Sequence, residues 1–391
     1  WSALTTLNYD GNGYNTAMGY AAGMSVTTAT QNTLIGSQAG GALTTGGQNT
    51  VLGYRALYTE DTGVGATAIG YKALHLQNAD GSYYNTAIGH NAAQALTTGA
   101  QNTVIGAEAG YSITTGNNNI AIGYRALYTE DGNGNNVAIG REALEVQNAG
   151  ADAYNIAIGY RAGHAVSTGA NNVFIGGEAG DAITTGSGSV AIGRQALSTE
   201  DAGGGAVAIG YQALQDQDGG DTFNVAVGYR AGRNVTTGVN NILIGASSGD
   251  TLTTGGYNIG IGYQALKTED AHGRNVAIGH QALETLDAGA DAYNIAIGYD
   301  AGQAMTTGVR NIIMGGIAGD ALTTGGHNVA IGYGALSAED AHGRNVAIGS
   351  GALYAQDAGA DAYNVAIGYD AGQAVTTATY NTLIGGLAGD A

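Results

Sequence analysis

The stretch NVAIGREALEVQNAGADAYNIAIG, residues 136–159, contains twice the five-residue phrase that decides the fold. In this phrase Asn is followed by a β-branched residue, usually Ala, an apolar residue and Gly, and it recurs 22 times from Gly19 to Gly385. Successive glycines are 17, 17, 17 and 19 residues apart, with one spacing of 18, so four phrases make a 70-residue unit. A short fixed period predicts a stack of near-identical coils, each of which buries its apolar face against its neighbours.

The phrase itself predicts a short strand and a corner. We number it from Asn (position 1) to Gly (position 5). β-branched or apolar residues at positions 2 and 4 fit a pleated strand with one face buried. The glycine either supplies a positive φ at a corner or lets two backbones approach closely, and we favour the corner. The expected fold is therefore all-β: a parallel β-solenoid, or β-roll, of about 22 coils with 17–19 residues per coil. Residues 1–391 are expected to form one continuous repeat domain without evident caps.

Composition restricts the partners. The formal charge is −19, only 11% of residues are charged, and cysteine is absent. Such a surface repels nucleic acid and anionic membranes, so neither is an expected partner. No apolar stretch approaches the length that spans a membrane, so no membrane insertion is expected. The chain begins at Trp1 rather than Met, which fits a processed secreted protein or an incomplete start, and we expect an extracellular location.

The asparagines at position 1 predict a ladder along the stack. In-register parallel strands place identical side chains about 4.8 Å apart, so their amides can hydrogen-bond from coil to coil. The alternative is that each Asn bonds the backbone of its own turn. The expected ladder is represented by Asn85, Asn102, Asn119, Asn136, Asn155 and Asn172.

The four coils of each 70-residue unit, which we call a, b, c and d, differ in where their large residues lie. The a and b coils carry Gly at position 9, as at Gly163 and Gly180, whereas the c and d coils carry Leu. In b coils position 3 is large while position 6 is small, which is consistent with volume compensation in one packed interior. The same large residues could instead form an exposed row for lateral assembly. They are Leu34, Val104, Phe174, Leu243, Ile313 and Leu383.

No catalytic set, cofactor motif or strong metal motif emerges, so we do not expect an enzyme. The best cation candidate is calcium at Asp131, Asn133 and Asn135, where oxygen ligands alternate with glycine; a turn-forming loop explains the same string. His272 and His342 occupy matching places in c coils, and duplication of a surface loop explains that match without a metal.

Three phrases resemble a known repeat class. Asn-Thr-Ala-Ile-Gly (85–89) and Ile-Gly-Tyr-Arg-Ala-Leu-Tyr (122–128) look like the NTAIGYxAL-type repeats of phage tail-fibre-like and bacterial surface proteins. Asn-Val-Ala-Ile-Gly (136–140) is similar to the head repeats of trimeric autotransporter adhesins. The resemblance implies a parallel β-roll and, as one alternative, a homotrimer.

The two chain ends suggest how copies could join. The sequence stops inside a b coil at Gly389-Asp390-Ala391 and starts inside a d coil, which leaves open strand edges. End-to-end stacking of identical subunits would pair those edges, with Trp1 and Leu387 as assembly candidates. The expected function is a structural subunit of an extracellular fibre or filament. The alternative is a tail-fibre or adhesin shaft, as a homotrimer, that binds cell-surface glycans.

Overall fold

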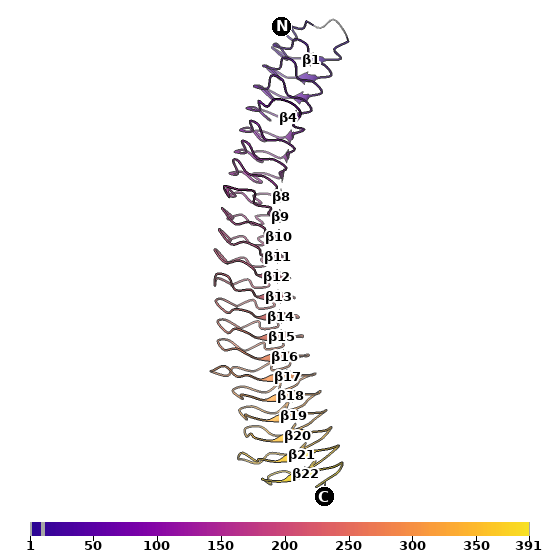
Figure 1. Ribbon diagram of the computed structural model, residues 1–391, viewed down its shortest axis with the longest axis vertical. Coiled ribbons are helices and arrows are strands. Elements are labelled where there is room, and N and C mark those ends of the chain that lie inside the picture. Colours follow the sequence, from indigo (N-terminus) through magenta and orange to yellow (C-terminus); the bar gives the residue numbers. More distant parts are fainter. Residues whose placement is uncertain (1, 9–11, 391) are drawn as a thin grey trace. The chain divides into compact units, whose positions relative to one another are not determined.

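The protein is a parallel β-solenoid, as the repeat predicts. The computed structural model describes residues 2–8 and 12–390. Contacts divide the chain into two compact units, residues 1–194 and 195–391, and each unit contains eleven three-residue strands. Within each unit the strands lie above one another, one per coil (Figure 1), and the described part of the chain contains no helix. The expectation of a single continuous domain stays a prediction.

The strands fall on positions 2 to 4 of the phrase. In the first unit they are β1 (Thr16–Met18), β2 (Thr33–Ile35), β3 (Thr50–Leu52), β4 (Thr67–Ile69), β5 (Thr86–Ile88), β6 (Thr103–Ile105), β7 (Ile120–Ile122), β8 (Val137–Ile139), β9 (Ile156–Ile158), β10 (Val173–Ile175) and β11 (Val190–Ile192). In the second they are β12 (Val207–Ile209), β13 (Val225–Val227), β14 (Ile242–Ile244), β15 (Ile259–Ile261), β16 (Val276–Ile278), β17 (Ile295–Ile297), β18 (Ile312–Met314), β19 (Val329–Ile331), β20 (Val346–Ile348), β21 (Val365–Ile367) and β22 (Thr382–Ile384).

Within each unit, neighbouring strands pair in parallel and without any shift of the phrase. Val137 of β8 faces Ile156 of β9, so each position of one coil lies against the same position of the next. The backbone bonds continue beyond the strand: the Gly140 amide donates to the Ile122 carbonyl at 2.7 Å. The coils are therefore bonded to one another all along their length, which is the interaction that a single coil cannot make for itself.

The glycine at position 5 satisfies both of its expected roles. Gly140 has a φ of +137°, a region that residues with a side chain rarely adopt. A Cβ placed there would also lie 2.2 Å from the carbonyl oxygen of Gly159 in the next coil. The corner therefore requires glycine for its backbone conformation and for the close approach of the coils.

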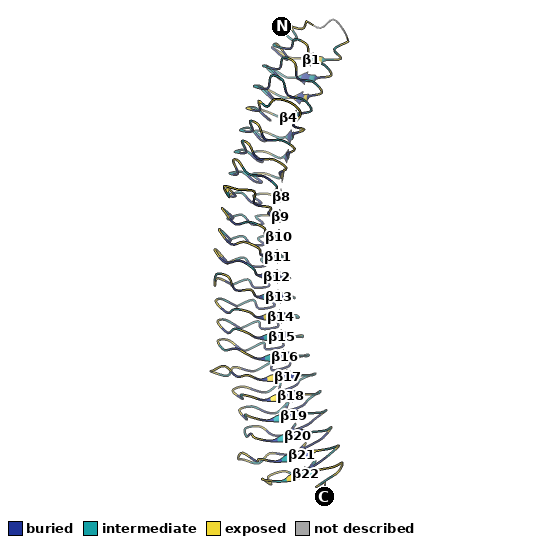
Figure 2. Ribbon diagram, in the orientation of Figure 1, coloured by how far each residue is buried: buried dark blue, intermediate teal, exposed yellow. Residues whose placement is uncertain are grey.

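The strand buries its middle residue and turns its outer two residues toward the surface. Ala138 and Ala157, at position 3, are fully buried, whereas Ile156 and Ile158 on either side are more than one-third exposed. Figure 2 shows that the coils contain both buried and accessible segments. Most coils place Ala at this buried position, and the β-branched residues form the outer face of the sheet.

The large residues of b coils fill the interior. Five of the six residues considered for an exposed assembly row have at most 1% of their surface accessible, so the volume-compensation alternative holds for them: Leu34, Val104, Phe174, Leu243 and Ile313. The small residue that makes room for each of them is at position 9 and not at position 6, which corrects the expected compensation between positions 3 and 6. A Cβ at Gly163 would lie 2.7 Å from the Phe174 ring and one at Gly180 would lie 2.5 Å from it, whereas a Cβ at Gly177 would meet nothing.

Candidate functional site

The asparagines of position 1 form a buried column of hydrogen bonds. The Asn119 backbone amide donates to Asn102 Oδ1 at 2.9 Å, and Asn119 Oδ1 accepts from the Asn136 amide at 3.0 Å. The Asn119 Nδ2 donates to the Asn133 carbonyl, 14 residues later in the same coil. The column runs along the stack, as the ladder requires, but its bonds are mainly from side chain to backbone. Direct amide-to-amide bonds are fewer, such as Asn102 Nδ2 to Asn85 Oδ1 at 3.2 Å.

The other expected site residues are distributed along the stack. Trp1 lies outside the described residues. Leu387 is 56% exposed and Leu383 is half-buried. In the calcium candidate, Asn135 Nδ2 donates to Asp152 Oδ2 of the next coil, and the Asn133 amide donates to Glu130 Oε1 within its own turn.

One interior column carries polar residues in some coils. Position 12 holds apolar residues in a and b coils, such as Val166 and Ile183, and these are fully buried. In c coils the same position is glutamate, and in most d coils it is glutamine, with no more exposure. The glutamates are Glu60, Glu130, Glu200, Glu269 and Glu339. Five carboxyl groups therefore occupy places that other coils fill with hydrocarbon.

Each of these glutamates caps its own turn and faces the next coil. Oε1 of Glu200 accepts from the Gly203 amide at 2.7 Å, three residues along the chain. Its Oε2 accepts from Nε2 of Gln217, the position-12 residue of the following d coil, at 3.1 Å. Burying a carboxylate is costly unless its oxygens are hydrogen-bonded, and in Glu200 both oxygens are.

Glu269 lacks that neighbour. The next d coil has Leu286 at position 12, and Leu286 is fully buried. Glu269 Oε1 accepts from the His272 amide at 3.1 Å, but its Oε2 has no hydrogen-bond partner. Oε2 of Glu130 and of Glu339 also lacks a partner, although each is followed by a buried glutamine whose Nε2 is unpaired too.

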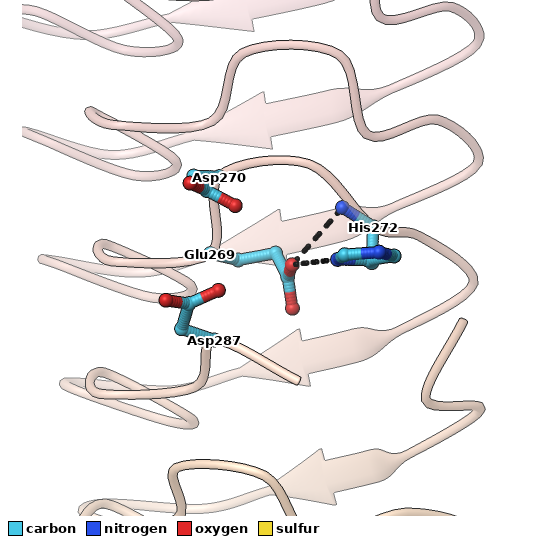
Figure 3. Close-up of side chains that lie close together, drawn as sticks. All are labelled: Glu269, Asp270, His272 and Asp287. Carbon is cyan, nitrogen blue, oxygen red and sulfur yellow. Dashed lines mark hydrogen bonds and ion pairs between the residues drawn. The ribbon is translucent and has the colours of Figure 1, made fainter. Parts of the chain in front are cut away.

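The surroundings of Glu269 contain further ligand-type side chains. Glu269, Asp270 and His272 come from one c turn and Asp287 from the next coil, and one ligand atom from each lies within 4.8 Å of the others. Figure 3 shows the Glu269 carboxyl between Asp287 and the His272 ring. The ring Nδ1 is 3.9 Å from Glu269 Oε1, too far for a hydrogen bond, and it is a buried atom with no hydrogen-bond partner.

The electrostatics of this cluster favour a bound positive charge. Desolvation by burial raises the pKa of Glu269 to about 7, against the lowering effect of the His272 amide. The nearby carboxylates of Asp287 and Asp270 raise this pKa further, and the Ala288 amide lowers it slightly. At neutral pH the buried carboxyl therefore holds a proton part of the time.

The sequence contained a signal for these buried acids. Four of the five c coils read Thr-Glu-Asp shortly after their leucine, and the fifth reads Ala-Glu-Asp, which resembles an exposed acidic turn. Alignment on the phrase, however, puts this Glu in register with Val166 and Ile183, which replace the missing leucine of a and b coils. A position that is apolar in half of the coils is interior in all of them, because every coil has the same path.

Comparison with protein-family models gives no match, and comparison with curated proteins gives none either. Among the described residues, no helix is long and apolar enough to cross a membrane.

Proposed function

We propose that the chain is a structural subunit of an extracellular fibre or shaft, in which copies of the chain pack against one another. The observation that carries this proposal is the outer face of the strands in residues 195–391. Every strand from β12 to β21 begins with Val or Ile, and every strand from β12 to β22 ends with Ile, Val or Met. These positions form two adjacent uncharged columns on the surface of the unit.

The size of this face supports self-association. Ile242 and Ile244 at the two outer positions of β14 are 38% and 37% exposed. Two such side chains expose roughly 100 Å² per coil, so eleven coils offer roughly 1,000 Å², above the ~800 Å² per partner of a standard interface. Monomeric soluble proteins rarely leave so large an apolar patch open. A second copy presents the same columns with the same spacing of about 4.8 Å, so two faces can interdigitate along their length.

Glycan binding by a shaft is less well supported. Aromatic residues do form outer columns, as in the stack of Tyr54, Tyr71 and His90 with ring centroids 5.5 and 5.0 Å apart. The faces of these rings are turned toward neighbouring rings, and a sugar would need a free ring face on which to stack. End-to-end joining of copies and the extracellular location remain parts of the proposal that imaging and fractionation can test.

The test is a concentration series of the purified chain, measured by light scattering and electron microscopy. Fibres or defined oligomers are expected for the natural sequence. Ile244→Lys, which puts a charge on the outer face, is expected to prevent lateral association, whereas Ala271→Lys on an exposed turn is the matched control. A natural chain that stays monomeric at high concentration contradicts the proposal.

A further inference from the structure

We propose that the Glu269 cluster is a binding site for a divalent transition-metal ion of the zinc type, formed by Glu269, Asp270, His272 and Asp287. This inference does not depend on the proposed fibre. The four side chains offer three carboxylate oxygens and one imidazole nitrogen, all within 4.8 Å of one another. Imidazole together with carboxylates is a donor set that zinc accepts, whereas calcium prefers oxygen ligands alone.

Two unpaired buried atoms point to a ligand rather than to a solvated acidic turn. Glu269 has no exposed surface, and its Oε2 lacks a partner. Nδ1 of His272 is also buried and unpaired. A buried carboxylate oxygen and a buried imidazole nitrogen that lack hydrogen-bond partners each cost free energy in the empty state, and a cation that both side chains coordinate reduces those costs.

The repeat provides its own comparison. In the c turn of Glu200 the residue at the place of His272 is Gly203, and Gln217 satisfies the second carboxylate oxygen. At Glu269 both features have changed: histidine stands at the turn, and leucine has replaced the glutamine. One change adds a metal ligand and the other removes the competing hydrogen-bond donor.

The site needs only a small rearrangement to bind an ion. Ligand atoms of a tetrahedral zinc site lie about 3.3–3.5 Å apart, as follows from zinc–ligand distances of about 2.0–2.1 Å. A separation of 4.8 Å must therefore close by about 1.4 Å. Asp270 and Asp287 are exposed and can rotate toward the buried Glu269, and they also leave a route for the ion from solvent.

A second c turn shares part of the set. Glu339, Asp340 and His342 form a group of three ligand atoms under the same distance limit, with Nδ1 of His342 3.6 Å from Glu339 Oε1. The following d coil has Gln356 and not leucine at position 12. This group has one ligand fewer, so we expect it to bind zinc more weakly than the Glu269 cluster.

The test is calorimetric titration of the full chain with zinc chloride after treatment with a chelator. Cobalt is the spectroscopic probe, since its visible absorption reports tetrahedral coordination. Glu269→Gln and His272→Asn are each expected to weaken the tightest site at least about tenfold, because each removes a ligand. Asn133 stands at the place of His272 in another c turn, so His272→Asn is compatible with the fold. Circular dichroism checks that both variants remain folded.

Two further variants serve as controls. Glu200→Gln is the matched change in a turn without histidine and should leave zinc binding unchanged. Leu286→Gln restores the amide found at Gln217 and should weaken binding without removing any ligand. The proposal is overturned if the natural chain binds no zinc, if Glu269→Gln and His272→Asn bind it as the natural chain does, or if Glu200→Gln loses it equally.

Discussion

The packing of Phe174 against two glycines can be tested by a double-mutant cycle. Phe174 is fully buried, and its ring occupies the space that a side chain at Gly163 or Gly180 would need. Phe174→Ala empties that space and should lower the free energy of unfolding by about 3–5 kcal/mol. Gly180→Leu places a Cβ 2.5 Å from the ring and should also destabilise, by about 1–3 kcal/mol or more.

The double variant should lose less free energy of unfolding than the sum of the losses in the two single variants. Gly180 has a φ of +59°, and Leu197 and Leu214 adopt φ values of +52° and +47° at the same position of other coils, so the backbone accepts leucine. With Phe174→Ala, the leucine enters the vacated space, which reproduces the Ala-and-Leu arrangement of c and d coils. We expect a favourable coupling of about 2 kcal/mol or more.

Urea unfolding followed by circular dichroism measures this coupling. Gly177→Ala is the control, because a Cβ at Gly177 meets nothing within 4 Å and its effect should add to that of Phe174→Ala. Solenoids can unfold in parts, so the slopes of all transitions must agree before free energies are compared. Additive losses in the Phe174→Ala and Gly180→Leu pair would refute the reasoning that the two positions share one space.

Three other predictions concern the coil contacts and the buried acids. Asn119→Ala leaves the Asn136 amide without its acceptor and should cost about 2 kcal/mol in a urea transition; no loss would contradict a stabilising ladder. Gly140→Ala forces a Cβ to within 2.2 Å of the Gly159 carbonyl and should cost more than about 4 kcal/mol, seen as loss of the folded circular dichroism signal; a folded variant with natural stability would refute the close approach. Burial raises the pKa of Glu200, so its stabilisation is complete below the unfolded-state pKa of about 4.3 and is lost as the pH rises through the folded value. Glu200→Gln should therefore flatten the fall in stability over that pH range. An unchanged pH profile would contradict the assignment of this fall to Glu200.

The sequence predicts the coils well because their spacing is a backbone property. A glycine every 17–19 residues defines one turn, and the strands fall on the phrase in every coil. Alternation alone, however, does not tell which face of a strand is inside. Ala138 is interior and Ile139 is outside, and this choice depends on packing across the coil.

The candidate metal site could be predicted only in part. His272 can be identified in the sequence, but its proposed role as a metal ligand depends on a buried Glu269 three residues earlier and on Leu286 in the next coil. A charged residue in a Thr-Glu-Asp turn is usually solvated, so its residue type alone predicts that Glu269 lies at the surface. Only the register between coils places this carboxylate in the interior, and that register also brings Asp287 beside it.

The central claim is that each phrase forms one coil that is bonded to the next. Spin labels measure this directly, because the chain has no cysteine of its own. Labels at Tyr54→Cys and Tyr124→Cys, four coils apart in the first unit, should lie about 19 Å apart, and labels at Tyr54→Cys and Tyr160→Cys, six coils apart, about 29 Å. Distances from pulsed electron–electron double resonance that grow by about 4.8 Å per coil agree with one coil per phrase. Distances near 100 Å, as a helix over the same 70 residues would give, contradict it.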